Sequence, residues 1–452
     1  MNSIVDAVLP EPATTTQDAT ATEVGSVFVS NYPPYSFWSE SGISEVQTRL
    51  MTPPAGPEEV PLGLYLHIPF CRKRCKFCYF RVYTDRNSSQ IQTYLDTLAR
   101  EVELYSDMSR ISGRPLKFVY FGGGTPSYIS ARHLRALADR LKKAIPWDQA
   151  EEVAFECEPG TLSKSKLETI REIGVTRLSL GLENLNDGIL KENGRAHLSS
   201  KIFEVLPWVK ALDFDQVNVD LISGMIGETW ETWRETVRQT VEMDADSVTI
   251  YQLELPFNTV FSKHILTESG NPVQVADWAL KREWHQYAIE QFEAAGYESS
   301  SAYSLVKKGG KVNFIYRDAV WQSSDMIGAG VASFSHINGI HFQNHVHWDP
   351  YIEAVEAGDF PLNRAFATTQ EERMNREVIL QLKTGRITTD YFSRKFGVDI
   401  LESFKGAIQK LQSEKMLDFD EKGITLTRQG LLRVDQLLPE FYDEKYRNSR
   451  YT

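Results

Sequence analysis

Short, mostly apolar runs alternate with amphipathic stretches along residues 62–253, and this alternation limits the chain to few fold classes. The apolar runs are typical of strands buried on both faces of a sheet and are LGLYLHI (62–68), KFVYF (117–121), EEVAFEC (151–157), RLSLGL (177–182), QVNVDLI (216–222) and SVTIYQL (247–253). Helical periodicity fills the intervals between them, at residues 91–106, 131–145, 163–174, 199–212 and 229–244. Strands joined by crossover helices predict an α/β fold, in which right-handed crossovers curl a parallel sheet into a full or partial barrel.

The segments on either side predict three further parts. A Thr-rich leader and an aromatic, proline-containing segment precede the first strand. A helical pattern and two strand-like runs follow the last one, at residues 275–296, 297–305 and 325–335. From about Pro361 the pattern is helical, with a short hairpin at 418–430 that would form a two-stranded wing. We therefore expect a disordered leader and N-terminal extension (1–60), a (β/α)6 core (61–260), a barrel-completing α/β segment (261–360) and a small, mainly helical, winged-helix-like domain (361–452).

Composition places the chain among globular proteins with a small-molecule site. Its 452 residues are 42% hydrophobic and 24% charged, which is enough to bury a large core. The formal charge of -12 is spread without long runs of one sign, so we expect neither a nucleic-acid nor a membrane partner. No apolar run is long enough to cross a bilayer, and the N-terminus lacks a secretory signal pattern. We expect a cytoplasmic protein, and a monomer because no large apolar surface helix stands out.

Three of the four cysteines lie within HIPFCRKRCKFCYF, at residues 67–80. This clustering indicates a metal site rather than a disulfide framework. A structural zinc site needs four ligands, so His67 or a distant histidine would have to complete it. A four-iron cluster tolerates three thiolates and leaves one iron open to a ligand. An open iron can chelate the amino and carboxylate groups of S-adenosylmethionine (SAM) and reduce its sulfonium, which yields methionine and a 5'-deoxyadenosyl radical.

Other motifs also follow strands, where the carboxyl ends of a parallel sheet meet at one edge. GGGTP (122–126) follows the second strand, and ECEP and GLEN close the third and fourth. Backbone N–H groups in a glycine turn can hold a carboxylate, although this motif alone is as typical of a tight turn. Glu156, at the third strand end, is a natural acceptor for ribose hydroxyl groups.

HINGIHFQNHVHW contains nearly half of the histidines, namely His336, His341, His345 and His347. Its Asn-Gly dipeptide predicts a hairpin. Strand alternation would place these side chains on different faces, so we favour solvent exposure or hairpin packing over metal or haem ligation.

Together these motifs resemble the radical SAM superfamily, in its oxygen-independent coproporphyrinogen III oxidase-like branch. The resemblance is carried by LYLHIPFCRKRCKFCYF, YFGGGTPSYIS, FECEPGTL, RLSLGLENLNDGIL, VNVDLISGM and DMIGAGVASFS. It extends from about Tyr32 into the C-terminal domain. It implies a partial (β/α)6 radical SAM barrel, a [4Fe-4S] cluster on Cys71, Cys75 and Cys78, and an oxidoreductase of porphyrin biosynthesis.

The resemblance also implies residues that bind one or two SAM molecules. Those lining the cluster-bound SAM would be Tyr65, Phe77, Gly123 and Glu156. Those matching contacts of a second SAM are Gly124, Thr125, Arg195 and Asp220, with Glu183 beside them. Considered without the family, Tyr65 would be an ordinary strand aromatic, Arg195 would pair with Glu192, and Asp220 would merely close a strand.

The chain departs from the oxidase pattern at two positions. Phe80 stands where the oxidases have a fourth cysteine, and Glu183 replaces a glutamine. A carboxylate there must be paired or protonated. A tetracarboxylate substrate should also meet several basic side chains, and the candidates are Arg72, Arg81, Arg86 and Arg195.

Three functions therefore compete. The first is oxidative decarboxylation of a tetrapyrrole propionate to a vinyl group, which the oxidase-like N-terminal segment favours. The second is a radical SAM methyl or methylene transfer, and the third is a non-catalytic haem chaperone; Phe80 favours these two. The basic residues between the cysteines offset the negative charge of a cluster, and could also dock an electron donor such as flavodoxin or ferredoxin.

Overall fold

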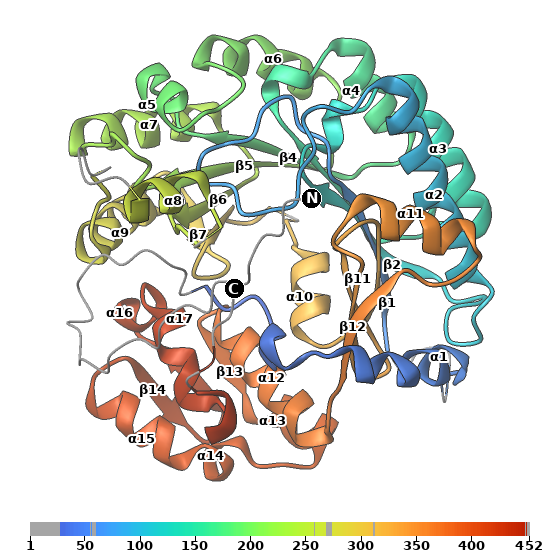
Figure 1. Cartoon of the computed structure of the whole chain (residues 1–452). Helices are drawn as coiled ribbons and strands as arrows, with labels where there is room; N and C mark the ends of the chain where they lie inside the picture. Colours follow the sequence, from blue (N-terminus) through green and yellow to red (C-terminus); the bar gives the residue numbers. More distant parts are fainter. Residues whose placement is uncertain are drawn as a thin grey trace.

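A curved sheet of twelve strands forms the centre of the computed structural model, which describes residues 28–54, 56, 60–256, 258–267, 274–310, 312–447 and 449 (Figure 1). The strand order is β12-β11-β10-β9-β1-β2-β3-β4-β5-β6-β8-β7. The expected Thr-rich leader, residues 1–25, lies outside the described residues.

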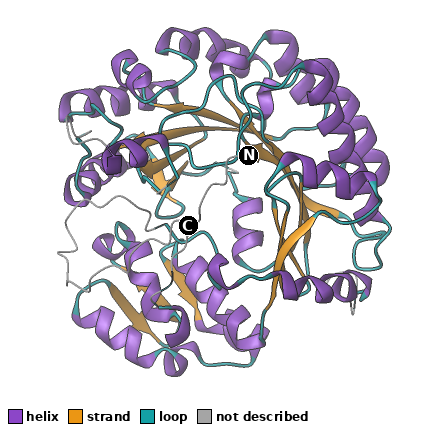
Figure 2. Ribbon diagram, viewed as in Figure 1, coloured by secondary structure: helices purple, strands orange, loops and turns teal. Residues whose placement is uncertain are grey.

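The predicted parallel core is confirmed. Strands β1 to β6 pair in sequence order, each parallel to the next. They are β1 (Leu62–Ile68), β2 (Leu116–Gly123), β3 (Glu152–Cys157), β4 (Arg177–Glu183), β5 (Gln216–Ser223) and β6 (Ser247–Gln252). The crossover helices are α2 (Ser88–Ser106), α3 (Ala131–Ala144), α4 (Lys164–Glu172), α5 (Asp187–Glu192), α6 (Ser199–Ala211) and α7 (Trp230–Met243). These helices cover the outer, convex face of the curved sheet, and its concave face is turned towards the centre of the molecule (Figure 2).

Helix α2 illustrates how local sequence sets these elements. Asn87 accepts a hydrogen bond from the Gln90 N–H at 3.0 Å, and the Gln90 side chain accepts one from the Asn87 N–H at 3.1 Å. This reciprocal cap satisfies two N–H groups that lack helical partners. Leu95, Leu98 and Val102 then recur at three- and four-residue spacing and are buried, so that one face packs against the sheet.

Further strands extend both edges of the sheet. Strand β9 (Asp325–Ala329) pairs in parallel with β1, followed by antiparallel β10 (Phe334–Ile337), β11 (Ile340–Asn344) and β12 (Leu362–Ala367). At the other edge, β8 (Ser304–Lys307) and β7 (Tyr297–Ser299) are antiparallel. Each of the strand-like runs at 297–305 and 325–335 is thus divided by a turn into two strands.

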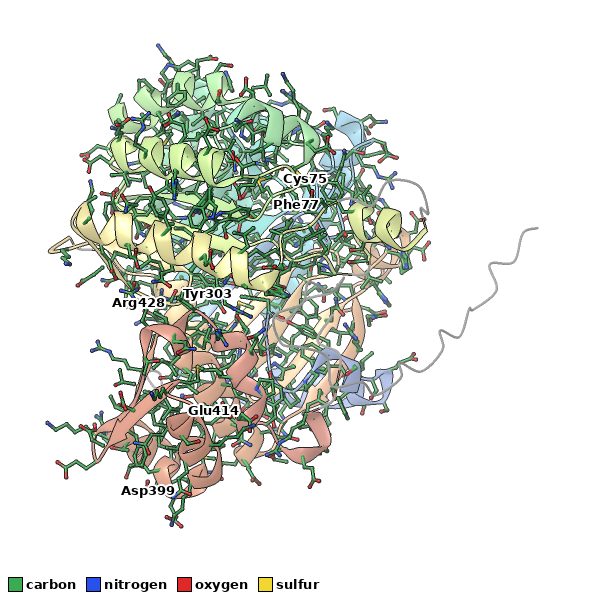
Figure 3. All side chains as sticks on the ribbon, turned by 90° about the vertical axis from the view of Figure 1, so that its left-hand side faces the viewer. Cys75, Phe77, Tyr303, Asp399, Glu414 and Arg428 are labelled. Carbon is green, nitrogen blue, oxygen red and sulfur yellow. The ribbon has the colours of Figure 1, made fainter. Side chains whose placement is uncertain are left out.

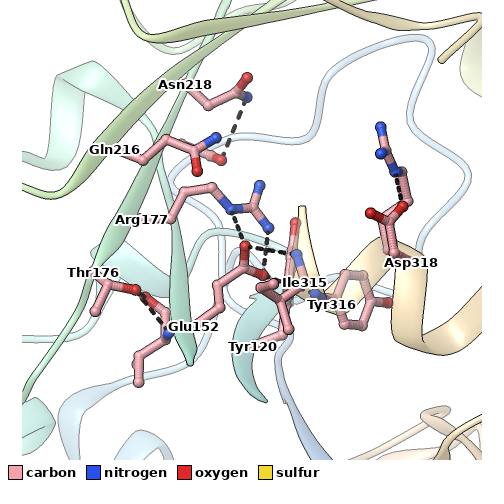
Figure 4. Close-up of polar contacts among 12 residues, drawn as sticks. Tyr120, Glu152, Thr176, Arg177, Gln216, Asn218, Ile315, Tyr316 and Asp318 are labelled. Atoms are coloured by element: carbon pink, nitrogen blue, oxygen red, sulfur yellow. Dashed lines mark hydrogen bonds and ion pairs between the residues drawn. The ribbon is translucent and has the colours of Figure 1, made fainter. Parts of the chain in front are cut away.

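Helix α10 (Ile315–Trp321) closes the amino-terminal end of the barrel (Figure 4). Its first two N–H groups, of Ile315 and Tyr316, donate to the Glu152 carboxylate at 3.3 and 3.1 Å. Arg177 donates to both oxygens of the same carboxylate at 3.1 Å. Both charged residues begin strands and are buried, so this ion pair anchors the helix below the site.

The remaining helices surround the barrel and build the C-terminal domain. They are α8 (Val260–Thr267), α9 (Trp278–Ala294), α11 (Trp348–Glu356), α12 (Gln370–Leu382), α13 (Thr389–Phe396), α14 (Ile400–Ser403), α15 (Lys405–Ser413), α16 (Arg428–Leu431) and α17 (Val434–Leu437). Short 3₁₀ turns cover Pro126–Tyr128, Pro159–Thr161, Leu438–Phe441 and Glu444–Tyr446.

The C-terminal domain has its own apolar core, which includes Val378, Phe392, Ile408 and Leu417. Its wing has three strands rather than the expected two: β13 (Arg386–Thr388), β15 (Gly423–Leu426) and β14 (Leu417–Asp420), in that order. The additional strand is β13, a short strand that follows α12 in the sequence and pairs with β15.

The N-terminal segment joins the two cores. It contains two 3₁₀ turns (Tyr35–Phe37 and Glu40–Gly42) and α1 (Ile43–Met51). Its Tyr32 hydroxyl donates to Asp443 at 2.7 Å, and its Ser39 N–H donates to the Ala365 carbonyl at 3.1 Å. In the described part of the chain, no helix has both the length and the apolar character required to span a membrane.

One carboxylate, that of Asp435, links three parts of the molecule. It accepts a hydrogen bond from the Val29 N–H at 2.9 Å and pairs with Lys383 at 3.2 Å. It also accepts a short hydrogen bond from the Tyr303 hydroxyl. Helix α17, which carries Asp435, is thereby fixed at the junction of barrel and C-terminal domain.

Candidate active site

The three clustered cysteines lie on a loop that begins directly after β1. The Cys71 N–H donates to the Tyr83 carbonyl at 3.1 Å, and the Tyr83 N–H donates to the Pro69 carbonyl at 2.7 Å. These two bonds close the loop at its base. Burial, together with the charge of nearby thiols, raises the pKa of the Cys71 thiol to about 11 and that of Cys78 to about 12. The three side chains therefore converge, and a metal would have to displace their protons.

Two neighbouring loops contribute polar groups to the thiols. The Thr125 hydroxyl donates to Cys71 Sγ at 3.3 Å. Arg195 Nη1 donates to Cys75 Sγ at 3.4 Å. Hydrogen bonds and positive charge stabilise thiolates and hence metal ligation by sulfur.

The glycines of GGGTP are needed for contact between this turn and the cysteine loop. The Gly124 N–H donates to the Ile68 carbonyl at 2.9 Å. A Cβ at Gly124 would lie 2.9 Å from the Pro69 carbonyl carbon, closer than side chains tolerate. Gly123 has φ of +108°, and a Cβ there would lie 2.6 Å from His67 Nδ1. The turn is therefore both a tight turn and one wall of the site.

Carboxylates from three successive strands face the same space. Glu156, Glu183 and Asp220 lie at or near the carboxyl ends of β3, β4 and β5. Burial raises the pKa of Glu156 to about 7, although a 2.7 Å hydrogen bond from the Tyr120 hydroxyl opposes the shift. Burial and the charges of Glu183 and Glu156 raise the pKa of Asp220 to about 8. The three carboxyl groups can thus together attract a cation and also hold a proton near neutral pH.

Glu183 is paired rather than isolated. It has φ of +63° at an irregularity in the pairing of β4 with β5, and bulges of this kind redirect a side chain. Its carboxylate lies 3.5 Å from Arg195 Nη1. The alternative pairing of Arg195 with Glu192 is wrong, because Glu192 binds Lys76 at 3.1 Å.

These groups surround a cavity of about 580 Å³. Of the residues expected to bind SAM, those that line it are Phe77, Gly123, Gly124, Thr125, Glu156, Glu183, Arg195 and Asp220. Tyr65 is not among the lining residues. It stacks on Tyr120 with ring centres 5.8 Å apart, and its hydroxyl lies 3.3 Å from His67 Nδ1. The cavity extends from the cysteine loop to the C-terminal domain; in Figure 3, Cys75 and Phe77 lie above Tyr303.

The four candidate arginines do not converge. Arg72 and Arg195 line the cavity. Arg81 donates to the Val346 carbonyl at 3.0 Å and contacts His347 at 2.8 Å. Arg86 stacks over the ring of Trp348 at 4.7 Å. Two of the four are therefore committed outside the cavity.

The histidine hairpin differs in one respect from expectation. His336 and His341 are cross-strand partners on either side of the Asn-Gly turn, so they share a face. Their ring centres are 4.5 Å apart, and both side chains are buried. Burial lowers the pKa of His336 to about 3 and that of His341 well below its ordinary value. The prediction of different faces is wrong for this pair, whereas packing in the hairpin is observed.

Sequence reasoning missed a buried pair beside the cavity. His197 Nδ1 lies 2.5 Å from Glu158 Oε1. Burial acts to raise the pKa of Glu158, but the hydrogen bond and charge of His197 outweigh it and lower the pKa. The only signals were a second acid in ECEP and a histidine two residues after Arg195. Their contact spans 39 residues, which local patterns do not reveal.

The thiol donors fit an iron-sulfur cluster better than a single ion. Among the described residues, no three His, Cys, Asp or Glu side chains are gathered closely enough to hold one metal ion. In a cube, each thiolate binds a different iron, so the donors need not meet at one point. All of the cysteines are free of disulfides. Three thiols with an adjoining cavity thus suit a cluster that keeps one iron for a ligand.

Comparisons with known proteins agree with this arrangement. Residues 65–240 match the radical SAM superfamily, and residues 368–433 match the HemN C-terminal domain. The haem chaperone HemW of Bacillus subtilis is 27% identical over 84% of this chain and 99% of its own length. Oxygen-independent coproporphyrinogen III oxidases are 26% identical in Synechocystis, over 86% of this chain and 81% of that protein, and 25% identical in Escherichia coli, over 83% and 84%.

A solved structure has the same fold. Coproporphyrinogen III oxidase from Escherichia coli, described as a radical SAM enzyme, superposes with a TM-score of 0.78 and 24% sequence identity. The match covers 92% of this chain and 96% of that one. The barrel, its edge strands and the C-terminal domain are therefore shared.

Proposed function

We propose, from the premise that this chain belongs to the radical SAM superfamily and to its branch of oxygen-independent coproporphyrinogen III oxidases and haem chaperones, that it oxidatively decarboxylates a tetrapyrrole. Membership of the superfamily implies a [4Fe-4S] cluster and SAM. When bound, these groups supply a reductive cleavage of SAM that gives a 5'-deoxyadenosyl radical. The observation that carries the proposal is one cavity reaching from the thiols to the C-terminal domain.

The chain's own residues would hold the cofactors in distinct ways. Cys71, Cys75 and Cys78 would bind the cluster through thiolates, with Thr125 and Arg195 stabilising two of the sulfurs. Glu156, fixed by Tyr120, would accept hydrogen bonds from the ribose of the nucleoside. Glu183 and Asp220 would offer negative charge to a sulfonium or ammonium group. Glu183 is already paired with Arg195, beside the expected position of a second SAM. This pairing supports the binding of one SAM.

The substrate would occupy the part of the cavity towards the C-terminal domain. Aromatic side chains there, including Tyr79, Tyr251, Trp278 and Tyr303, provide an apolar wall that suits a large ring. In the proposed reaction a propionate loses carbon dioxide and one hydrogen atom, and an electron leaves to an acceptor as a vinyl group forms. Arg72 and Lys73 are exposed on the cysteine loop and would dock an acidic donor such as flavodoxin or ferredoxin. We place this activity in the cytoplasm.

A haem chaperone is the second candidate. Its support is Phe80, which is exposed next to Tyr79 at the cavity, and the 99% coverage of a haem chaperone by the match. A methyl or methylene transferase has no comparable support from these comparisons.

One anaerobic experiment separates the three functions. Protein reconstituted with iron and sulfide would be incubated with coproporphyrinogen III, SAM and a reductant, with and without an electron acceptor. Vinyl products and carbon dioxide would support the oxidase, and methylated products the transferase. If the same protein, titrated with haem in parallel, binds it stoichiometrically and does not convert coproporphyrinogen III, the result would support the chaperone and overturn our proposal.

A further inference from the structure

Arg282 is a buried cation that forms no ion pair among the residues that the structure describes. It lies on α9, lines the cavity and is 8% exposed. Its Nη2 has no hydrogen-bond acceptor. The attraction that acts on its guanidinium comes from Asp277 at the start of α9, which does not reach ion-pair distance. Burying an unpaired charge is destabilising, so an arginine kept in this state points to a ligand that supplies the missing anion.

A second arginine approaches from the other domain. Arg433 of the C-terminal domain lines the same cavity. Burial lowers the pKa of Arg282, and the charge of Arg433 lowers it further, which places the two cations near each other; Asp277 opposes this shift from the start of α9. The carboxylate closest in sequence to Arg433, that of Asp435, is already bound by Val29, Lys383 and Tyr303.

An ion pair farther along the same helix joins α9 to the C-terminal domain. Glu293, eleven residues after Arg282 on α9, binds Arg428 of α16 through both carboxylate oxygens, at 2.6 and 2.7 Å. Both contacts are made by Arg428 Nη2, and they tie α16 to the last turns of α9. Helix α9 and the loop after α16 therefore present Arg282 and Arg433 as one preformed element.

The neighbouring surface is aromatic. Trp278 precedes Arg282 by about one helical turn, and Tyr303 and Tyr251 line the same cavity. Aromatic walls bind an apolar body, and the charged groups beside them, here Arg282, Arg433 and the acidic Glu254, orient it through its polar ends. The expected ligand thus combines a flat apolar ring with a carboxylate arm.

We propose that Arg282 and Arg433 form a carboxylate subsite, shared by the barrel and the C-terminal domain, which positions one acidic arm of the substrate. This inference rests on the proposed function for the nature of the ring, and deepens it by naming the residues that select carboxylated substrates. The arginine candidates identified by sequence, on and near the cysteine loop, are different residues.

The test compares an acid with its ester. Cluster-loaded protein would be titrated with coproporphyrin III and with its tetramethyl ester in the same detergent buffer, and binding followed by porphyrin fluorescence. Wild-type protein should prefer the acid by ~10-fold or more, the usual strength of a charge-assisted contact. Arg282→Gln and Arg433→Gln should each reduce this preference, the double variant should abolish it, and Arg282→Lys should retain part of it.

Controls separate this subsite from folding and from the SAM site. Arg238→Gln, which removes an exposed arginine of α7, should keep the full preference. Arg282→Gln should melt at the same temperature as wild type or higher, because it removes an unpaired buried charge. SAM affinity and 5'-deoxyadenosine formation without porphyrin should be unchanged in both single variants.

The outcomes are distinguishable. A double variant that keeps the preference for the acid would overturn the subsite and leave the proposed function standing. A loss of SAM affinity with unchanged porphyrin binding would assign the arginines to SAM and likewise overturn it. Wild-type protein that cleaves SAM but binds neither porphyrin would overturn the proposed substrate class and this inference together.

Discussion

Arg195 Nη1 lies 3.4 Å from the Sγ of Cys75, although the two residues are 120 positions apart in the sequence. The same nitrogen lies 3.5 Å from Glu183. One guanidinium thus connects a cluster ligand with the carboxylate that departs from the oxidase pattern. The electrostatics of the cluster site and of the nucleoside site are therefore coupled.

Cys75→Ala should abolish both the iron-sulfur absorbance and the formation of 5'-deoxyadenosine, because two thiolates cannot hold the cluster. Iron and sulfide content after anaerobic reconstitution would be measured with the nucleoside product. Cys157→Ala, which removes the buried cysteine outside the loop, should retain about four irons per chain. Unchanged product formation in Cys75→Ala would refute the cluster assignment.

Gly124→Ala should impair cluster loading without unfolding the barrel. The added methyl group would lie 2.9–3.0 Å from backbone atoms of Ile68, Pro69 and Phe70, and would displace the cysteine loop. The matched control is Gly406→Ala in α15, where nothing lies within 4 Å and where alanine should stabilise the helix by ~0.5–1 kcal/mol. Equal iron content in the two variants would contradict this account.

Glu183→Gln should lower the pKa of Asp220, since the charge of Glu183 is the largest contribution after burial that raises it to about 8. An ionised Asp220 attracts the cationic SAM, so the rise in SAM affinity with pH should shift to lower pH. Calorimetric titration of cluster-loaded protein from about pH 6 to 9 would measure the shift. Glu192→Gln, which removes an exposed carboxylate paired with Lys76, should leave the profile in place.

The buried Glu101, which lies away from the site, should make the stability of the protein depend on pH. Burial raises its pKa to about 7, against hydrogen bonds from Tyr351, Gly330 and Asn344. The folded state therefore holds a proton that the unfolded state releases above about pH 4.5, so the free energy of unfolding falls as the pH rises from there to about 7. This single group should account for up to about 3 kcal/mol of that fall.

Denaturant titrations at about pH 5 and pH 7 would test the point. Glu101→Gln cannot ionise, so its free energy of unfolding should fall by about 2 kcal/mol less than that of wild type between these two pH values. Glu168→Gln, at an exposed position of α4, should behave like wild type. A pH dependence in Glu101→Gln as steep as that of wild type would be evidence against the buried proton.

Glu152→Ala should destabilise the protein by ~3–5 kcal/mol, because it leaves the buried Arg177 without its counter-charge and removes the acceptor for α10. The free energy of unfolding would be compared with that of the double variant Glu152→Gln, Arg177→Met. The double variant should lose less, since neither charge then remains buried. Equal losses would contradict this account, because they would show that the unpaired charge of Arg177 adds nothing to the loss.

The sequence was sufficient to predict the parallel core because strands buried on both faces are continuous apolar runs. It also placed the cysteine loop, the glycine turn and Glu156 at the same edge, since carboxyl ends of parallel strands converge. The hairpin at the edge of the sheet was harder to predict, because β7 and β8 are only three and four residues long. Their separation depends on a turn that apolarity does not mark.

Charged pairs were the least predictable part of the site. Glu158 with His197, and Arg282 with Arg433, come from elements whose proximity is decided by packing of the whole chain. The prediction for the histidine pair was wrong for a related reason. Counting alternate positions assigns faces within one strand, whereas the pairing register across the turn decides which residues of the two strands lie opposite each other. His336 and His341 pair directly because the turn has two residues.

The links made by Asp435 have a consequence for how the protein is assembled during synthesis. Its partner Val29 precedes it by 406 residues, and Arg433 lies two positions before it. A growing chain therefore possesses its cysteine loop long before it has the residues that complete the cavity mouth. Before the C-terminal domain is made, that part of the cavity wall is missing, so we expect the cysteine loop to be accessible to donors of iron and sulfide at that stage.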